Sequence, residues 1–390
     1  MLIFLIISAL TLLLIIYGAI EYRLHQKNLQ AIPIRIHING TRGKSSVTRL
    51  IGAGLRAGGY KTITKVTGTF PRLILPDGSE AHIHRKEKAN ILEQLDIIKY
   101  CSTQQADVLI IECMALQPIY QKITEHQMVK ATHGVITNIR LDHLDVMGPR
   151  LQNVADAICG TIPKNSKLFT SEDRYLDQMQ KMATQQKTQL FKSDACSVSD
   201  DDLAGFSYIE HKDNIALALD ICANLGVDRS LALMEMKRSI PDEGVLRRYA
   251  IYEEEKRIHF YNALAANDPE STLMIYDAIQ QQSDKEEHFM FLLNTRKDRQ
   301  DRAVRLVDMI SSIQFGSVAL IGESLDLVVK MCLNKNIDLD RILPIGLKTA
   351  QEQFKDLLQT ATKQTTILAI GNMGAGGAEL AQYFEQQHQH

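Results

Sequence analysis

The feature that most constrains this chain is a glycine-rich loop between a predicted strand and a predicted helix. The loop is Gly-Thr-Arg-Gly-Lys-Ser at residues 40–45; residues 34–38 alternate as a strand before it, and residues 47–56 are apolar at helical spacing after it. Backbone N–H groups at such a helix start bind phosphate oxygens. Lys44 can then reach the terminal phosphates, and the Ser45 hydroxyl can bind Mg²⁺.

This loop departs from the common phosphate-loop pattern, which has a glycine six residues before the lysine. That position is Ile38 here, and Gly40 lies only four residues before Lys44. The alternative is a glycine turn that happens to precede a lysine. The agreement of strand, loop and helix favours phosphate binding.

The first 20 residues form a second constraint, because none of them carries a charged side chain. A helix of that length spans about 30 Å, the thickness of a bilayer core. Arg23 and Lys27 follow the apolar run and no basic residue precedes it, which places the chain after residue 22 in the cytoplasm. A cleaved signal peptide is the alternative, but it would want a basic start, a shorter apolar core and a small-residue cleavage site. We therefore expect a single-pass protein of the cell (inner or cytoplasmic) membrane with a cytoplasmic catalytic body.

Composition excludes several classes of protein. Lys and Arg number 44 against 46 Asp and Glu, a formal net charge of -2, which argues against a nucleic-acid binder. The six cysteines are scattered without a C-x-x-C pair, which argues against a disulfide framework and a structural zinc site.

Strand and helix signals alternate along the body, as in α/β domains with parallel sheets. Residues 108–111 and 134–137 are continuous apolar runs typical of buried parallel strands. A second series of strand candidates begins after residue 244. We predict a transmembrane anchor at residues 1–22, a polar linker at 23–33, a P-loop ATP-binding domain at 34–240, and a smaller Rossmann-like domain at 241–390.

Two more motifs follow predicted strands, at the sheet edge where ligands of α/β proteins gather. One is Glu112, at the end of the run 108–111, and the other is Asp142-His143-Leu144-Asp145. Imidazole and carboxylate groups can both bind a divalent ion. Each has a plainer alternative, because a strand-end Glu can face solvent and because Asp and His are common in turns and caps.

Together and in this order, these motifs resemble the ATP-dependent Mur ligase superfamily, which joins carboxylates to amines. The resemblance includes the loop 40–45, Thr67-Gly68-Thr69, Glu112 and residues 137–145. Residues 213–218 resemble the family's asparagine-containing helix near the adenine, Arg247-Arg248 follows at the domain junction, and residues 266–269 resemble the nucleotide-contacting start of the C-terminal domain. One departure is Ala263, where the family usually has an Asp.

Closer still, the chain resembles the ligase-subunit family of bacterial poly-γ-glutamate synthases (CapB/PgsB type). This resemblance covers nearly the whole chain and includes the apolar N-terminal helix, Glu112-Cys-Met-Ala and the run Arg296-x-Asp-Arg-x-Asp-Arg302. It implies that ATP, with Mg²⁺, phosphorylates a glutamate carboxylate and that an amine attacks the acyl phosphate to extend γ-linked polyglutamate. It also implies small integral-membrane synthase or export subunits as partners, and the sequence is compatible with a homo-oligomer.

The resemblance assigns roles to individual residues, and it reverses the plainer interpretation of the arginine run as a solvated helix start. The implied catalytic residues are Lys44, Glu112, His143 and Arg299. The implied nucleotide-binding residues are Gly40, Thr41, Arg42, Gly43, Lys44, Ser45, Ser46, Asn214, Arg247, Asn267 and Asp268. The implied metal ligands are Ser45, Thr69, Glu112 and His143, and glutamate or the growing polymer would bind Arg296, Arg299 and Arg302.

Two observations refine the implied chemistry. The phosphate loop begins near residue 39, and most of what precedes it is the apolar helix, so we expect no room for the domain with which peptidoglycan ligases bind a UDP-linked substrate. Several Mur-type ligases carry a modified lysine about fourteen residues after the motif His; that position is Ala157 here, which leaves the number of metal ions open.

Other functions remain open at this stage. A folylpolyglutamate-type ligase also lacks the UDP-binding domain, but the membrane helix and Ala157 count against it. A membrane-anchored nucleotide-binding regulator or transport ATPase would use the same phosphate loop without forming a new bond.

Overall fold

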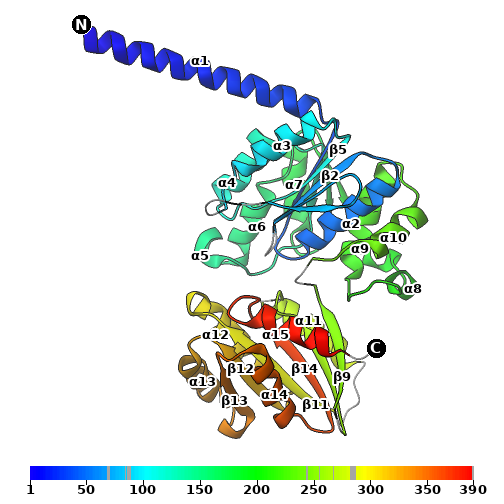
Figure 1. The fold of residues 1–390 in the computed structure, drawn as a ribbon. Helices are drawn as coiled ribbons and strands as arrows, with labels where there is room; N and C mark the ends of the chain where they lie inside the picture. Colours follow the sequence, from blue (N-terminus) through cyan, green and yellow to red (C-terminus); the bar gives the residue numbers. More distant parts are fainter. Residues whose placement is uncertain are drawn as a thin grey trace. The chain divides into compact units, whose positions relative to one another are not determined.

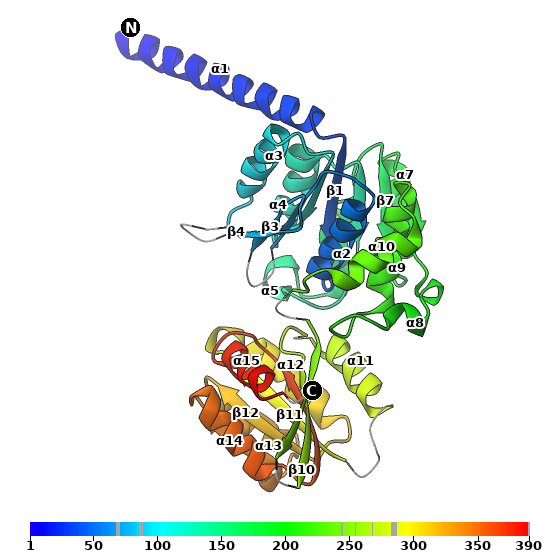
Figure 2. The same ribbon diagram turned by 45° about the vertical axis from the view of Figure 1, so that its right-hand side comes forward.

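The computed structural model describes residues 1–67, 71–83, 85, 89–242, 245–253, 255–266, 268–281 and 287–388. Its chain divides into two compact units, shown in Figures 1 and 2. The first unit contains Met1–Phe206 and His211–Asp242, and the second contains Ser207–Glu210 and Glu243–His390. Each unit is described by itself.

The first unit is built on an eight-stranded sheet with the order β4-β3-β2-β5-β1-β6-β7-β8 in the described part of the chain. Its strands are β1 (Ile34–Asn39), β2 (Thr62–Val66), β3 (Arg72–Ile74), β4 (Glu80–His82), β5 (Val108–Glu112), β6 (His133–Ile136), β7 (Lys167–Thr170) and β8 (Gln189–Lys192). The strands from β2 to β8 in this order pair in parallel, and the short β3–β4 hairpin adds an antiparallel edge.

Helices cover both faces of this sheet (Figure 2). They are α2 (Lys44–Ala57), α3 (Glu93–Thr103), α4 (Pro118–Ile123), α5 (Leu144–Met147), α6 (Leu151–Cys159), α7 (Leu176–Gln185), α8 (Asp200–Leu203), α9 (Lys212–Asn224) and α10 (Arg229–Arg238), with a π-helix η1 (Thr124–Val129) and a 3-10 turn η2 (Ala195–Ser197). The side chains of β5 alternate between two cores: Ile110 packs with α2 and α9, while Leu109 and Ile111 pack with α3 and η1. This two-sided burial explains why the strand is continuously apolar.

The described residues of the second unit form a six-stranded sheet with the order β13-β12-β11-β14-β10-β9. The strands are β9 (Arg247–Glu253), β10 (Lys256–Asn262), β11 (His288–Thr295), β12 (Ser317–Gly322), β13 (Ile342–Gly346) and β14 (Gln364–Ile370); the helices are α11 (Pro269–Gln280), α12 (Gln300–Ser311), α13 (Leu325–Asn334), α14 (Ala350–Thr360) and α15 (Gly377–Gln387), with 3-10 turns η3 (Lys297–Arg299) and η4 (Leu339–Arg341). All strand pairs are parallel except β9–β10. The predicted fold class, two α/β domains behind an apolar N-terminal helix, is confirmed.

Helix α1 (Leu2–Gln30) is long and apolar enough to cross a membrane, as either an anchor or an N-terminal signal would be. It continues past residue 22, so most of the segment 23–33 that the sequence predicts as a linker is helical. The end of α1 is fastened to the sheet by Arg35, whose guanidinium donates to the carbonyl oxygens of Leu29 (3.0 Å) and Ile32 (2.6 Å). This contact from outside the segment stabilises a helical end that composition alone does not indicate.

Candidate active site

The predicted motifs gather at one edge of the first sheet. The neighbouring strands β2, β5, β1 and β6 run parallel, so their carboxyl ends share that edge. Thr67 follows β2, Glu112 ends β5, the loop 40–45 follows β1, and the segment 137–145 follows β6. Motifs that lie far apart in the sequence therefore become neighbours through the strand order, as in other open α/β sheets.

The phosphate loop needs both of its glycines, for reasons of space and of backbone conformation. Gly40 has φ 134°, and a Cβ there would lie 2.0 Å from Thr137 Oγ1. Gly43 has φ 76°, and a Cβ there would lie 2.6 Å from Asn214 Oδ1. Only glycine fits both positions. The second contact also places the predicted nucleotide-binding residue Asn214 against the loop, on the same unit.

The segment after β6 holds the loop in place. Thr41 N–H donates to Asn138 O (2.9 Å), Arg42 N–H donates to Asn138 Oδ1 (3.0 Å), and Thr137 Oγ1 donates to Arg42 O (2.6 Å). Thr137 and Asn138 are thus positioning residues that the site prediction omitted. Their place in the motif 137–145 was the available signal, but their partners depend on β6 lying beside β1.

Lys44 occupies the first position of α2 and folds back over its own loop. Its ammonium donates to the carbonyl oxygens of Gly40 (2.8 Å) and Thr41 (3.2 Å). A cation held there lies beside the N–H groups that would receive phosphate oxygens.

Ser45 and Glu112 form the oxygen pair of the site. Ser45 Oγ donates to Glu112 Oε2 at 3.0 Å, and Thr67 N–H donates to the same oxygen at 2.7 Å. Glu112 is buried, with 3% of its surface exposed. A hydroxyl and a carboxylate oxygen at this separation are the hard ligands that Mg²⁺ prefers. Thr69, the third predicted oxygen ligand, lies outside the described residues.

The described residues supply only part of a metal shell. Within the described ranges, no three His, Cys, Asp or Glu side chains are grouped as metal ligands. Mg²⁺ is commonly held by one or two carboxylates together with substrate phosphates and water. The pair Ser45 and Glu112 therefore fits an ion that arrives with a nucleotide.

His143 belongs to a charged group that reaches the phosphate loop. It adopts a left-handed backbone (φ 47°) at the start of α5, and its Nε2 lies 3.7 Å from Asp142 Oδ2. The same Asp142 oxygen lies 3.4 Å from Arg42 Nη2. The structure therefore joins His143 to the loop through Asp142. The metal-ligand role of His143 stays a prediction.

A buried lysine behind the site was not anticipated. Lys65 on β2 is fully buried, with its Nζ 2.7 Å from Glu93 Oε1 and 3.1 Å from Gln94 Oε1. Burial lowers the pKa of Lys65, and Glu93 opposes this effect. Gln94 Nε2 donates to Glu112 O at 3.4 Å, so the group supports the strand end that carries the site carboxylate. A lysine inside a predicted strand was the available sequence signal.

A second buried pair joins strand β1 to the π-helix η1. His37 Nδ1 is 2.7 Å from Glu125 Oε2, and both side chains are 1% exposed. Burial opposes the charge on His37, but the neighbouring Cys113 and Glu125 side chains outweigh burial and raise the pKa of His37 to about 10. The pair supports the central strand and does not need to touch a substrate.

The predicted residues of the second unit have varied surroundings. Asp268 is buried and caps α11 by accepting the Ser271 N–H at 2.9 Å. Arg247 pairs with Glu385 at 2.7 Å, and Asn267 lies outside the described residues. The nucleotide-binding roles of these three residues stay predictions.

Two of the three arginines in the run at the start of α12 already have side-chain partners. Arg296 pairs with Asp298 at 2.8 Å, and Arg302 donates to Asn372 Oδ1 and to Gly371 O. In the part of the chain that the structure describes, the Arg299 guanidinium has no hydrogen bond or ion pair, which leaves it available to a ligand carboxylate.

Two family models match the chain and together cover most of it. The Mur ligase middle domain matches residues 38–225, and the poly-γ-glutamate synthase CapB C-terminal domain matches residues 248–387. With the phosphate loop and its carboxylate neighbour, this match defines an ATP-dependent amide ligase of the Mur ligase type.

Curated relatives narrow the class further. The PGA synthase CapB of Bacillus subtilis (strain 168) is 35% identical over 378 residues, which cover 96% of this chain and 95% of that protein. The capsule biosynthesis protein CapB of Bacillus anthracis is 41% identical over 322 residues, 82% of this chain and 69% of that protein. The chain belongs to the poly-γ-glutamate synthase CapB family, as the sequence motifs predict.

Solved structures share the fold at low sequence identity. FolC of E. coli in complex with ADP superposes with a TM-score of 0.71 and 15% identity, over 94% of this chain and 92% of that one. A bifunctional folylpolyglutamate synthase/dihydrofolate synthase with Mn, AMPPNP and L-glutamate bound has a TM-score of 0.67 and 12% identity, over 93% and 92%. These likenesses establish the architecture alone.

Proposed function

We propose that this chain uses ATP to activate the γ-carboxylate of glutamate and couples it to the amino group of another glutamate, building γ-linked polyglutamate. The observation that carries the proposal is the Ser45–Glu112 contact of 3.0 Å beside Lys44, at the sheet edge where the phosphate loop ends. The CapB family membership supplies the polymer as the expected product. The solved relative that holds Mn, AMPPNP and L-glutamate supports the same set of ligands.

The chemistry needs a site that overcomes charge repulsion. Two like unit charges 4 Å apart repel by about 4 kcal/mol at an effective dielectric near 20, and several negative charges must meet when a carboxylate approaches ATP. Lys44 provides a cation on the loop, and Ser45 with Glu112 would hold Mg²⁺, which neutralises charge on the phosphates. The loop N–H groups, held by Thr137 and Asn138, orient the phosphate chain.

The proposed reaction has two balanced steps. A γ-carboxylate oxygen of glutamate attacks the terminal phosphorus of ATP, and ADP leaves to give an acyl phosphate. The α-amino group of the next glutamate attacks the acyl carbon, phosphate leaves, the amide forms and one proton is released. In this proposal His143, Arg42 and Asp142 form the charged wall of the site, and Arg296, Arg299 and Arg302 bind carboxylates of glutamate or the polymer.

The proposed location is the cytoplasmic face of the cell membrane, with α1 as an uncleaved anchor and small integral-membrane synthase or export subunits as partners. The support is the apolar helix with its basic flank at Arg23 and Lys27. Protease should cleave the body in inside-out vesicles and spare it in right-side-out vesicles; the opposite pattern would refute this orientation.

Glutamate-dependent release of ADP by the purified full chain tests the proposed function. We expect ADP release to rise on addition of L- or D-glutamate with Mg²⁺, and Lys44→Ala to abolish it while leaving the circular dichroism spectrum unchanged. The matched control is Lys192→Ala, which should keep activity. Lys192 lies outside the phosphate loop and pairs with Asp173. Turnover that ignores amino acids would favour a nucleotide-dependent regulator or transporter, and turnover that survives in Lys44→Ala would remove Lys44 from the site.

A further inference from the structure

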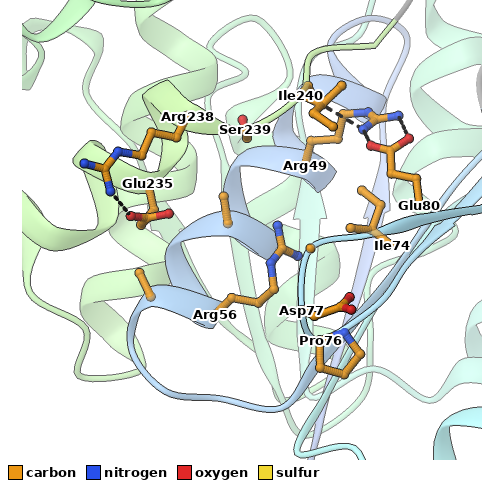
Figure 3. Close-up of a pocket in the computed structure, with 13 residues that line it drawn as sticks. Arg49, Arg56, Ile74, Pro76, Asp77, Glu80, Glu235, Arg238, Ser239 and Ile240 are labelled. Carbon is orange, nitrogen blue, oxygen red and sulfur yellow. Dashed lines mark hydrogen bonds and ion pairs between the residues drawn. The ribbon is translucent and has the colours of Figure 1, made fainter.

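A cavity of about 370 Å³ lies in the first unit, apart from the oxygen pair Ser45 and Glu112 (Figure 3). Three elements line it: one face of α2, the β3–β4 hairpin, and the end of α10 with the residues that follow. Its volume falls in the range of small-molecule sites, about 300–1,000 Å³.

The cavity is lined by three arginines and three carboxylates, so the formal charges of these six groups cancel. They are Arg49, Arg56, Arg238, Asp77, Glu80 and Glu235. Arg49 is hydrogen-bonded to Glu80, and Arg238 pairs with Glu235 at 2.8 Å. Two of the three guanidinium groups are therefore already neutralised by carboxylates of the chain.

Arg56 is the exception. Across the described ranges its guanidinium has no ion pair or hydrogen bond, and the Nη1 atom is buried without a partner. Figure 3 shows its guanidinium between the Glu235–Arg238 pair and the Arg49–Glu80 pair. Burial lowers the pKa of Arg56, although Glu235 and Glu80 act in the opposite direction. A partly buried cation without a hydrogen-bonded partner is costly, and an anion from solution would relieve that cost.

The surroundings of Arg56 restrict which anion fits. A guanidinium pairs with a carboxylate in bidentate geometry. The carboxylates of Asp77 and Glu235 would repel a phosphate or another multiply charged anion, but they can accept hydrogen bonds from an ammonium group. A molecule that carries both a carboxylate and an ammonium matches a cavity of balanced charge.

We propose that this cavity is a second amino-acid site, in which Arg56 holds the carboxylate of a free α-amino acid and Glu235 and Asp77 receive its ammonium group. The choice of glutamate as the probe rests on the proposed function. Because α2 begins with Lys44 and Ser45 and also carries Arg49 and Arg56, one helix connects the cavity to the phosphate loop. An amino acid bound here would regulate nucleotide turnover according to amino-acid supply.

Isothermal titration calorimetry of the full chain in detergent, without nucleotide, tests this site with L-glutamate, D-glutamate, glutarate and inorganic phosphate. We expect at least one glutamate enantiomer to bind, and Arg56→Met to weaken its binding by about tenfold to a hundredfold, as loss of a charged hydrogen bond does. Arg229→Met is the matched control, because Arg229 lies on the same helix as Arg238 but pairs with Asp202 and does not line the cavity. Equal glutamate binding by wild type and Arg56→Met, or no binding at millimolar glutamate, overturns the proposal.

Three further variants separate the charges from the fold and from the ligase reaction. Ala57→Leu keeps Arg56 but fills the cavity, so it should weaken glutamate binding even if Arg56→Met proves unstable. Glu235→Gln should weaken glutamate but not glutarate, which lacks the amino group; glutarate or phosphate that binds as tightly as glutamate to wild type overturns the amino-acid assignment. Lys44→Ala should abolish ADP release and keep the Arg56-dependent binding, so failure of the site and failure of the ligase function give different results.

Discussion

The proposed chemistry depends most on the carboxylate of Glu112. One of its oxygens accepts hydrogen bonds from both the Ser45 hydroxyl and the Thr67 N–H. These bonds fix a buried negative charge where a magnesium ion would meet the phosphates.

Replacing Glu112 with Gln should raise the Mg²⁺ concentration needed for half-maximal ADP release by about tenfold to a hundredfold, since the ion loses an anionic ligand. The control is Glu172→Gln: Glu172 is another buried carboxylate near this edge, but it accepts the N–H groups of Ile139 and Arg174. A magnesium titration that shifts equally in both variants would mean that Glu112 is only structural.

The raised pKa of His37 predicts that pH affects the stability of the fold rather than the proposed reaction. Because its pKa is raised from 6.5 to about 10, the native state binds more protons than the unfolded state between these values. Its contribution to stability is complete below pH 6.5 and is lost as the pH rises towards 10. We expect the thermal unfolding midpoint of the full chain in detergent to fall over this range.

His37→Gln should remove this alkaline fall and lower stability by about 3–5 kcal/mol at neutral pH, because Glu125 loses its buried partner. His133→Gln is the control with the opposite sign. Burial, with a smaller effect of Lys167, lowers the pKa of His133 to about 4, so its contribution disappears on acidification below pH 6.5. An alkaline fall that persists unchanged in His37→Gln would contradict the assignment.

At the scale of elements, the neighbouring segments determine the conformation of the phosphate loop. The turn after β1 passes so close to Thr137, at the end of β6, that a side chain at residue 40 has no space. Backbone and side-chain hydrogen bonds therefore hold the loop and the segment after β6 together.

Gly40→Ala should weaken nucleotide binding and destabilise the first unit. Gly59→Ala is the matched control, because Gly59 also has positive φ (86°) but no atom within 4 Å of an added Cβ. Both variants carry the cost of a left-handed non-glycine residue, about 1–3 kcal/mol, so the difference between them measures the collision with Thr137. Thermal shift and a fluorescent ATP analogue give the two readouts; equal losses in both would contradict the steric account.

The sequence predicts those parts of the structure that depend on local pattern. Apolar runs and the glycine positions locate the strands and the phosphate loop, because periodicity and backbone conformation are local properties. Two sets of contacts depend on which strands become neighbours: the hydrogen bond from the loop to Asn138, and the support of Glu112 by Lys65 and Gln94. No local sequence pattern contains the order of the strands in the sheet. The helical end of α1 likewise depends on Arg35, a residue outside it.

At the scale of the whole molecule, two α/β units and an apolar helix are combined in one chain. The described residues of the first unit contain the phosphate loop, the oxygen pair and the cavity around Arg56. The second unit carries the arginine run, with Arg299 available for a carboxylate. In our proposal, the first unit binds ATP and the arginine run of the second unit binds carboxylates of glutamate or of the polymer.

The most direct test of the central claim follows the oxygen atoms of glutamate. Full chain in detergent is incubated with ATP, Mg²⁺ and glutamate labelled with ¹⁸O in the γ-carboxylate, and the released phosphate is analysed by ³¹P nuclear magnetic resonance. If the γ-carboxylate is activated as an acyl phosphate, one ¹⁸O atom passes into each phosphate released during coupling, and Lys44→Ala gives none. Glutamate-dependent phosphate that contains no ¹⁸O would contradict the account.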